Sequence, residues 1–408
     1  MNALRRVLRR EVITICAVIF LADVMSGVVS PTFSLYAQEL GASLTVVGAL
    51  SSTIGLTRLF SSMPIGVISD RVGRKAVLTV GMLLFALAAA GYAWSPNALW
   101  LFPARIVGGL AMVCTFFIGI AYVGDVVAPE ERGLAFGLYT TSMGAGFTVG
   151  PLFGAAVAER YGIAGSYLAA AALALIGAVI AARGLQRITN HGGSHQAVQR
   201  RLPWSGAADI LRQPGVVAGS LGNLLMSMSF GGAVANFFPV YTASLLVPQA
   251  VISSMFSVRA FGSTLARMPT GAIASRYPSR LLMYATLALT MVVLILMTQV
   301  SSTELLGLLL VLEGVAFGSF LTSGQIFVAE NCTPQTRGAA VGVYSTAGSL
   351  GSTASAIIFG AVADRFGVRL VFRLAGLLIL AGLLVIVFLS RRSAAAAVPR
   401  EMGAAEEA

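Results

Sequence analysis

Residues 66–75 read Gly-Val-Ile-Ser-Asp-Arg-Val-Gly-Arg-Lys and join two long apolar runs, at about 46–67 and 76–94. Each run is long enough to cross a bilayer, because a membrane-spanning helix needs about 20 apolar residues. The charged segment between them is therefore predicted to lie at a membrane surface as a short turn. The rest of the chain repeats this pattern of apolar runs joined by short polar turns.

The composition also indicates a membrane protein. Of 408 residues, 57% are apolar and 11% are charged, whereas a soluble domain has roughly 45–50% apolar and about 25% charged residues. Too few polar side chains remain to cover the surface of a soluble enzyme. We therefore predict an all-α membrane protein with twelve transmembrane helices. The twelve apolar runs lie at about 11–35, 46–67, 76–94, 98–124, 134–157, 164–183, 215–242, 248–272, 281–299, 305–329, 339–361 and 370–390.

Several functional classes are excluded by the residue types present. The single lysine, Lys75, follows Arg74, so the chain lacks the GxxxxGK[ST] phosphate loop of an ATP-driven pump. His191 and His195 lack the intervening glutamate of a zinc-protease helix. The three cysteines are scattered and predict neither a disulfide framework nor a zinc site. We expect no cofactor, no metal and no enzymatic activity.

The distribution of basic residues predicts the orientation of the chain. The 27 basic and 16 acidic residues give a net charge of +11. With the N-terminus inside, 19 basic residues fall in cytoplasmic segments and only three, Arg160, Arg365 and Arg369, fall in outer loops. Both termini are therefore predicted to be cytoplasmic, in a plasma membrane that we expect to be a bacterial inner membrane. This placement explains the basic charge, so no nucleic-acid partner is expected.

An internal repeat relates two halves of the chain at a constant offset of 205 residues. Over 132–162 and 337–367, 13 of 31 positions are identical, and Asp125 matches Glu330 in the same register. Parallel repeats with a site between them near mid-membrane are typical of one large transporter class. We predict a six-helix bundle at 1–183, a cytoplasmic linker at 184–214, a second six-helix bundle at 215–390 and a cytoplasmic tail at 391–408.

Three motifs resemble those of the major facilitator superfamily. Residues 66–75 resemble its GxxxD(R/K)xGR(R/K) signature, and residues 105–109 resemble its RxxxG motif. The fifth apolar run resembles the antiporter motif of the family's drug/proton exporters, although Ala155 stands where the family has a further glycine; the matching residues are Gly137, Gly146, Gly150, Pro151 and Gly154. The resemblance extends over residues 11–390. It implies the major facilitator fold, with two pseudo-symmetric six-helix bundles around a central cavity.

The charged turn at 66–75 is a candidate cytoplasmic gate. Two glycines among charges favour a tight turn packed against the opposite half, and Asp70 is expected at the positive N-terminal end of a neighbouring helix. The resemblance implies that Arg74 pairs with Asp125 and that such pairs break as the halves rock. Alternatively, the basic residues only hold the loop inside. The candidate gate residues are Gly66, Asp70, Arg71, Gly73, Arg74 and Asp125.

The second half departs from this gate pattern. Ser275 and Pro278 stand where the first half has Asp70 and Gly73. Because the second half lacks the acid and the second glycine, we expect an asymmetric gate that depends mainly on the first half.

The glycines of the fifth run are expected to make a close helix contact. Gly146, Gly150 and Gly154 recur every fourth residue and so share one helix face, while Pro151 removes a backbone donor and favours a kink. The resemblance implies that this kinked contact lies between the two halves and seals against leak during exchange. The alternative is ordinary small-residue packing between membrane helices.

Charged residues inside the apolar runs are the candidates for proton coupling. A charge at mid-bilayer is costly, by about 2.5–3.5 kcal/mol on an insertion scale, so it tends to be paired or functional. The resemblance implies that the first, fourth, seventh and tenth helices line the cavity. The candidates are Asp23 in the first run, Arg58 in the second, Arg105 in the fourth, Arg259 and Arg267 in the eighth and Glu313 in the tenth.

Among these residues, Asp23 is our candidate for the main proton-binding carboxylate. Burial favours its neutral form and a neighbouring Arg105 or Arg58 favours its charged form, so switching between these settings would couple proton binding to rocking. Glu313 is the second candidate, paired with Arg259. The alternative is that these residues form static ion pairs that tie helices together.

The seventh and tenth runs supply candidate residues for the substrate cavity. An aromatic wall with few polar groups favours an amphiphilic or lipophilic solute, although single aromatic residues are also common as lipid-facing bulk. The candidate cavity residues are Asn223, Phe230, Asn236, Phe238, Phe317 and Gln325.

Together these observations predict a monomeric secondary active transporter that exports a small amphiphilic compound in exchange for protons. Its expected partners are that compound, protons and membrane lipid. Two alternatives remain open: a nutrient importer or facilitator on the same fold, in which proton and solute move in the same direction, and a membrane receptor that binds a ligand without transporting it.

Overall fold

The computed structural model describes residues 9–187, 210, 212–333 and 336–406, and the side chains of these residues up to 390. The described residues are almost entirely helical and contain no strand. The first half comprises α2 (Arg10–Glu39), α3 (Leu44–Val72), α4 (Arg74–Ala93), α5 (Leu101–Met112), α6 (Ile118–Val126) and α7 (Arg132–Gly184). The second half comprises α10 (Pro214–Ser227), α11 (Ala235–Ser244), α12 (Gln249–Ala274), α13 (Ser279–Met297), α14 (Thr303–Glu330), α15 (Arg337–Phe366) and α16 (Val368–Glu406).

Two short π-helices and one glycine explain how these helices form twelve spans. A π-helix at Val113–Phe117 joins α5 to α6, and another at Met228–Val234 joins α10 to α11, so each pair makes one span. The helix α7 bends at Gly162, where φ is 71° and ψ is 174°, and so crosses twice. A positive φ of this size is accessible mainly to glycine.

The number of spans agrees with the sequence-based prediction. Ten helices in the described chain are long and apolar enough to cross a membrane when α7 is counted once. The helix α12 is not among them, and it carries Arg259 and Arg267 over its 26 residues. Counting both parts of α7 and adding α12 gives twelve, so the prediction of an all-α membrane protein with the twelve-helix architecture is confirmed.

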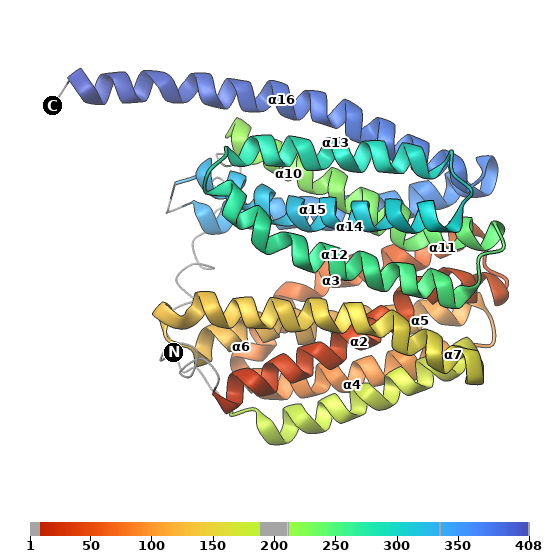
Figure 1. Cartoon of the computed structure of the whole chain (residues 1–408). Helices are drawn as coiled ribbons and strands as arrows, with labels where there is room; N and C mark the ends of the chain where they lie inside the picture. The colour runs from red at the N-terminus through yellow and green to blue at the C-terminus, as the bar shows by residue number, and fades with distance from the viewer. Residues whose placement is uncertain (1–8, 188–209, 211, 334–335, 407–408) are drawn as a thin grey trace.

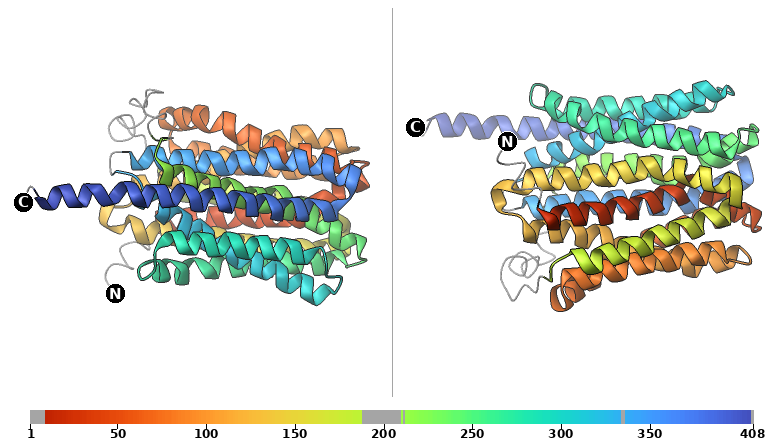
Figure 2. Two further views of the ribbon diagram at one scale, coloured as in Figure 1. Left: turned by 90° about the horizontal axis from the view of Figure 1, so that it is seen from above. Right: turned by 60° about the horizontal axis from the view of Figure 1, so that its bottom comes forward.

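The two halves lie beside each other with their helices along a common direction (Figures 1 and 2). Each half buries an apolar core of its own, from Val12 to Leu185 in the first and from Ile210 to Ile386 in the second. The backbone of α16 continues beyond the bundle to Glu406 (Figure 1). Most of the predicted linker at 184–214, including residues 188–209, lies outside the described residues.

The halves meet tightly at one end of α3 and α15. A Cβ added to Gly48 would lie 2.1 Å from the carbonyl oxygen of Ala356, so the two backbones are in direct contact. The Ser52 hydroxyl donates to the carbonyl oxygen of Thr353 at 2.6 Å. Asp364 accepts hydrogen bonds from the backbone N–H groups of Leu44, at 2.7 Å, and Thr45, at 2.8 Å, and from the Thr45 hydroxyl. We call this end, formed by residues 44–55 and 353–364, the closed rim.

The same helix faces separate at the opposite end. Gly66 lies eleven residues after Gly55, about three helical turns, and so shares its face. On α15, Gly342 lies eleven residues before Thr353 and shares the face that contacts α3. In the described part of the chain nothing lies within 4 Å of a Cβ added to Gly66 or Gly342. We call this end, formed by residues 66–75 and 337–342, the open rim.

The pair α7 and α12 shows the same separation. A Cβ added to Gly144 would lie 2.4 Å from the Thr264 hydroxyl oxygen of α12. Gly137 lies two turns earlier on the same face, and no described residue lies within 4 Å of a Cβ added there. The two halves therefore diverge from the closed rim toward the open rim.

Candidate functional site

Two adjoining cavities lie between the halves. The smaller has a volume of about 250 Å³ and the larger about 420 Å³. Both are lined by Arg58, Met112, Phe147 and Phe230, so they border one another along these residues. The larger cavity alone, and the two together, have a volume in the range typical of small-molecule sites, about 300–1,000 Å³.

Asp23 lies in α2 on the wall of the larger cavity. Its exposed fraction is 6%, yet within the described chain its carboxylate has no hydrogen bond and no ion pair within 4 Å. Its charged neighbour is Arg267 of α12, which lines the same cavity from the other half. The structure therefore places an acid without a fixed partner at the interface of the two bundles.

Glu313 and Arg259 have a different arrangement. Their side chains form an ion pair of 2.5 Å between α14 and α12, and the exposed fractions are 0% and 3%. The Arg259 guanidinium also lies over the rings of Phe230, at 3.7 Å, and Phe317, at 5.2 Å. Both helices belong to the second half, so this pair matches the static alternative that the sequence left open.

The expected proximity of Arg105 to Asp23 is not found. The Arg105 guanidinium lies 3.2 Å above the Phe33 ring and 5.6 Å from that of Tyr92. Phe33 is ten residues from Asp23 on the same helix, which corresponds to about 15 Å. Arg58 does share the larger cavity with Asp23. The arginine whose charge acts on Asp23 is therefore Arg267 and not Arg105.

Three of the six candidate cavity residues line the cavities. Phe230 lines both, Asn236 lines the smaller and Phe317 lines the larger. Asn236 also links the halves, because its side-chain oxygen accepts a hydrogen bond of 2.6 Å from the Ser51 hydroxyl of α3. The rest of the lining of the smaller cavity is a mixture of hydroxyl, aromatic and aliphatic side chains.

The other three candidates lie elsewhere. Asn223 donates to the carbonyl oxygen of Tyr344 at 2.8 Å, between α10 and α15. Phe238 is fully buried in the core of the second half, where its ring packs edge-on against Phe256. Gln325 is exposed and lines neither cavity. These three expectations failed because the sequence gives the span of a residue but not the direction of its side chain around the helix.

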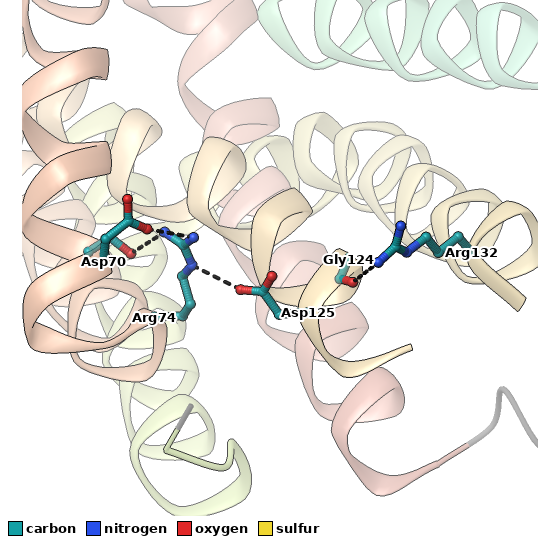
Figure 3. Close-up of polar contacts among 6 residues, drawn as sticks. Asp70, Arg74, Gly124, Asp125 and Arg132 are labelled. Carbon is teal, nitrogen blue, oxygen red and sulfur yellow. Dashed lines mark hydrogen bonds and ion pairs between the residues drawn. The ribbon is translucent and has the colours of Figure 1, made fainter. Parts of the chain in front are cut away.

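The charged turn at the open rim forms a compact network (Figure 3). Arg74 pairs with Asp70 at 2.7 Å and donates from Nε to Asp125 at 3.1 Å and from Nη1 to Ser69 at 3.1 Å. The side chains of Arg74 and Asp125 are only 9% and 8% exposed. The network ties α3, α4 and α6 together, so the structure brings together the acid and base that the resemblance paired. Next to it, Arg132 donates to the carbonyl oxygen of Gly124 at 3.1 Å.

All these helices belong to the first half, which differs from the expected packing against the opposite half. Gly73 has a φ of 99° and forms the turn between α3 and α4, as expected for a glycine. Gly66, in contrast, meets no neighbouring helix in the described chain, and Arg71 is exposed. The expected contact is absent because the halves are apart at this end. The charges therefore stabilise the first half itself in this conformation.

The glycines of the fifth run also differ from their expected role. A Cβ added to Gly146 would lie 2.4 Å from the carbonyl oxygen of Phe20, and one added to Gly150 would lie 2.4 Å from that of Val24. Gly154 meets Val28 in the same way. These contacts are all with α2, within the first half. The contact between the halves is instead made by Gly144, which the motif does not include.

Two further features of the antiporter motif correct the sequence-based expectation. The helix α7 continues through Pro151, so the helix is not broken at the predicted kink; its non-helical torsion angles occur at Gly162, in the turn between the two spans of α7. Gly137 faces open space in the described structure. Pro151 packs on Gly27 of α2, and this helix contact explains why the proline is accommodated without a break.

Arg267 was recognised from the sequence as a charge inside the eighth run but not as the neighbour of Asp23, and Asp364 was not recognised at all. Arg267 lies eight residues after Arg259, and this spacing places both on one face of α12 toward the larger cavity. Asp364 clamps the closed rim, and its counterpart in the repeat is Glu159. The helical spacing was a usable signal for Arg267, whereas no sequence pattern distinguished Asp364 from Glu159.

Comparison with known proteins agrees with this architecture. The family model described as Major Facilitator Superfamily matches residues 15–248 and 219–407. The multidrug resistance protein MdtG of Enterobacter lignolyticus is 25% identical over 395 residues, covering 94% of this chain and 92% of that protein. An uncharacterised MFS-type transporter of Methanocaldococcus jannaschii is 21% identical over 368 residues, covering 90% of this chain and 94% of that protein.

Among solved structures, that of the nucleoside transporter NupG superposes with a TM-score of 0.77 at 17% identity, covering 93% of this chain and 99% of that one. At this identity the similarity shows the fold alone. The match of the family model across the chain shows more: the protein belongs to the Major Facilitator Superfamily, and is an integral membrane transporter rather than an enzyme.

Proposed function

We propose that this protein is a proton-coupled exporter of a small amphiphilic compound, which works by alternating access. In one half-cycle the open rim closes and the closed rim separates, so the two cavities change the side to which they are exposed. The orientation follows the basic residues and puts the open rim in the cytoplasm. The multidrug resistance relative MdtG, similar over nearly its whole length, supports export as the direction.

The observation that carries the proposal is the unpartnered carboxylate of Asp23. An acid that is buried between the bundles and has no fixed hydrogen bond gains or loses a proton without breaking a static pair. Glu313, in contrast, is held by Arg259 at 2.5 Å, and an ion pair this deeply buried resists the loss of either charge. Of the two carboxylates, Asp23 is therefore the one that gains or loses a proton more easily when its cavity opens to water on one side of the membrane.

The surroundings of Asp23 define how its charge affects the bundles. Arg267 faces it from α12, Arg58 shares its cavity from α3, and Tyr139 of α7 and Cys16 of α2 lie nearby. Since Arg267 belongs to the other half, a charged Asp23 attracts α12 toward α2. Protonation removes that attraction, and this change links proton occupancy to the relative position of the bundles.

One observation favours a second function, in which proton and solute move in the same direction. Arg58 and Arg105 face the cavities without a carboxylate partner in the described chain. Protonation of Asp23 makes the cavity still more positive and so strengthens the binding of an anion. Coupling of this sign produces cotransport, as in a nutrient importer, rather than exchange.

Reconstituted vesicles separate these functions. A survival screen on toxic amphiphiles, in a host that lacks its own exporters, supplies a solute, and a pH-sensitive dye inside the vesicles then reports proton movement. An exporter of the proposed kind moves protons against the solute, and an importer moves both together. A receptor binds the solute without flux.

The role of Asp23 is tested in the same vesicles. Asp23→Asn is expected to abolish solute-driven proton movement, whereas Asp23→Glu retains part of it. Glu304→Gln removes an exposed carboxylate far from the cavities and is the matched control. Full proton movement in Asp23→Asn would show that another group carries the proton.

A further inference from the structure

The charges that face the two cavities do not balance. Five charged residues line the cavities, namely Asp23, Arg58, Arg105, Arg259 and Arg267, and Glu313 lies behind Arg259. Arg259 is paired with Glu313, and Arg267 faces Asp23 across the interface. Two arginines therefore remain without an acid. These two, Arg58 and Arg105, both line the smaller cavity, whose lining includes no carboxylate.

Neither arginine has all of its donors satisfied by the described chain. The Nε atoms of Arg58 and Arg105 are buried and have no hydrogen-bond partner in the described chain. The aromatic rings beside them, Phe117 at 5.7 Å from Arg58 and Phe33 at 3.2 Å from Arg105, supply cation–π attraction. Such contacts offset only part of the cost of burying an unpaired charge.

The rest of the smaller cavity indicates the size and polarity of the missing partner. Five serines, at positions 26, 30, 34, 51 and 352, and Asn236 supply polar groups to its wall. Met25, Val29, Phe147 and Phe230 supply an apolar surface. A guanidinium binds carboxylate, sulfonate and phosphate groups through paired N–H donors. A ligand with one such group and an apolar body satisfies both parts of the wall.

We propose that Arg58 and Arg105 form an anion-binding subsite and that the transported solute is an amphiphilic organic anion. This inference rests on the proposed transport function but not on its direction. The charged group of the solute lies between the two guanidinium groups, and its apolar body extends past Phe147 and Phe230 into the larger cavity. Arg58 lines both cavities, so it stays in contact with the solute as the bundles rock.

Three fluorescent probes of one size test the charge preference. N-dansylglycine carries one carboxylate, its amide is neutral, and dansyl-ethylenediamine is a cation. Binding is measured by fluorescence anisotropy with the full chain in lipid nanodiscs, without a proton gradient. The anion is expected to bind roughly tenfold to a hundredfold more tightly than the amide, as for a lost hydrogen bond to a charged group. Equal or tighter binding of the amide or the cation overturns the proposal, and so does failure of all three to bind.

Substitutions then identify the arginines. Arg58→Gln and Arg105→Gln are each expected to weaken binding of N-dansylglycine roughly tenfold and to leave the amide unchanged. Arg160→Gln removes an exposed arginine beside the Gly162 bend of α7, which lines neither cavity, and is the matched control. If both glutamine variants retain the affinity of the unmodified protein for the anion, the assignment of these arginines is wrong.

Two controls keep this test independent of folding and of proton coupling. Arg58→Lys and Arg105→Lys keep the charge but lose the paired donors, and are expected to bind with intermediate affinity. If a glutamine variant does not fold, the charge preference of the unmodified protein still decides the proposal. If the protein prefers the anion in nanodiscs but moves no protons in vesicles, the proposed proton coupling is wrong and this inference stands. If it couples protons to the transport of cations alone, this inference is wrong and the proposed coupling stands.

Discussion

The two ends of the contact between α3 and α15 have similar residues but different structures. At the closed rim, Gly48 and Gly360 let the two backbones touch. At the open rim, Gly66, Gly338 and Gly342 lie on the same faces and meet nothing in the described chain. The row of small residues on each helix face thus extends to the open rim, where α3 and α15 do not touch in the described chain. This difference indicates that the faces are built for contact at both ends, one end at a time.

The charges at the two ends have different uses. At the closed rim Asp364 bridges the halves through hydrogen bonds to Leu44 and Thr45. At the open rim Arg74 binds Asp70 and Asp125 within the first half. Among the described residues, the present conformation therefore has a polar clamp between the halves at the closed rim and none at the open rim. The predictions below change one end and leave the other as its control.

The largest effect is expected from Gly48→Leu. The carbonyl oxygen of Ala356 lies 2.1 Å from the added Cβ, so the closed rim must separate. Overpacking of this kind costs about 1–3 kcal/mol or more. We expect transport to be lost and a cysteine placed at Ser30, in the smaller cavity, to react at least roughly tenfold faster with an impermeant thiol reagent added outside intact cells. Unchanged labelling contradicts the assignment of this contact as the closed end.

The same substitution at the open rim has the opposite expected effect. Gly66→Leu meets no neighbour in the present conformation, so the protein is expected to fold and to bind solute normally. The added side chain prevents approach of α15 when the open rim closes. Transport is therefore expected to fall roughly tenfold or more while outside labelling of the cysteine at Ser30 decreases. Wild-type transport by Gly66→Leu would show that this face never closes.

The ion pairs at the open rim are expected to affect stability more than access. Arg74→Ala leaves Asp125 nearly buried and without its partner, and breaking a buried pair costs about 3–5 kcal/mol. The repeat offers a matched control, because Ser279 binds Glu330 at the equivalent positions of the second half. Ser279→Ala leaves an exposed acid and is expected to cost at most about 1 kcal/mol. Thermal unfolding of both variants in detergent measures the difference, and equal losses contradict it.

The sequence predicted the helices better than the site. Length, hydropathy and the repeat were sufficient for twelve spans in two halves, because each span must satisfy its backbone within the bilayer. The Arg74–Asp125 pair was also found, since a family motif and the repeat marked both residues. The charged motif therefore identified this one contact within the first half.

Contacts that depend on helix rotation or on the relation of the halves were predicted poorly. The glycines at 146, 150 and 154 share a face, but the spacing does not say which helix lies opposite, and the partner is α2. Arg105 was expected near Asp23, although stacking on Phe33 places it about 15 Å away along α2. These features depend on which helices of the first half lie side by side and on how each is rotated, which periodicity along one helix does not encode.

The smallest effect is expected at the clamp of the closed rim. Asp364→Asn keeps one acceptor oxygen but removes the charge, so the hydrogen bonds to the N–H groups of Leu44 and Thr45 weaken. Because this site is exposed, the expected cost is about 1 kcal/mol, equivalent to roughly a fivefold shift toward separation of the closed rim. The measurement is again outside labelling of the cysteine at Ser30.

Glu159→Gln is the control, because it changes the equivalent acid of the first half, which is exposed. It is expected to leave labelling unchanged. If both variants change labelling to a similar extent, the total negative charge at this end, and not the hydrogen bonds of Asp364 to α3, determines whether the closed rim separates.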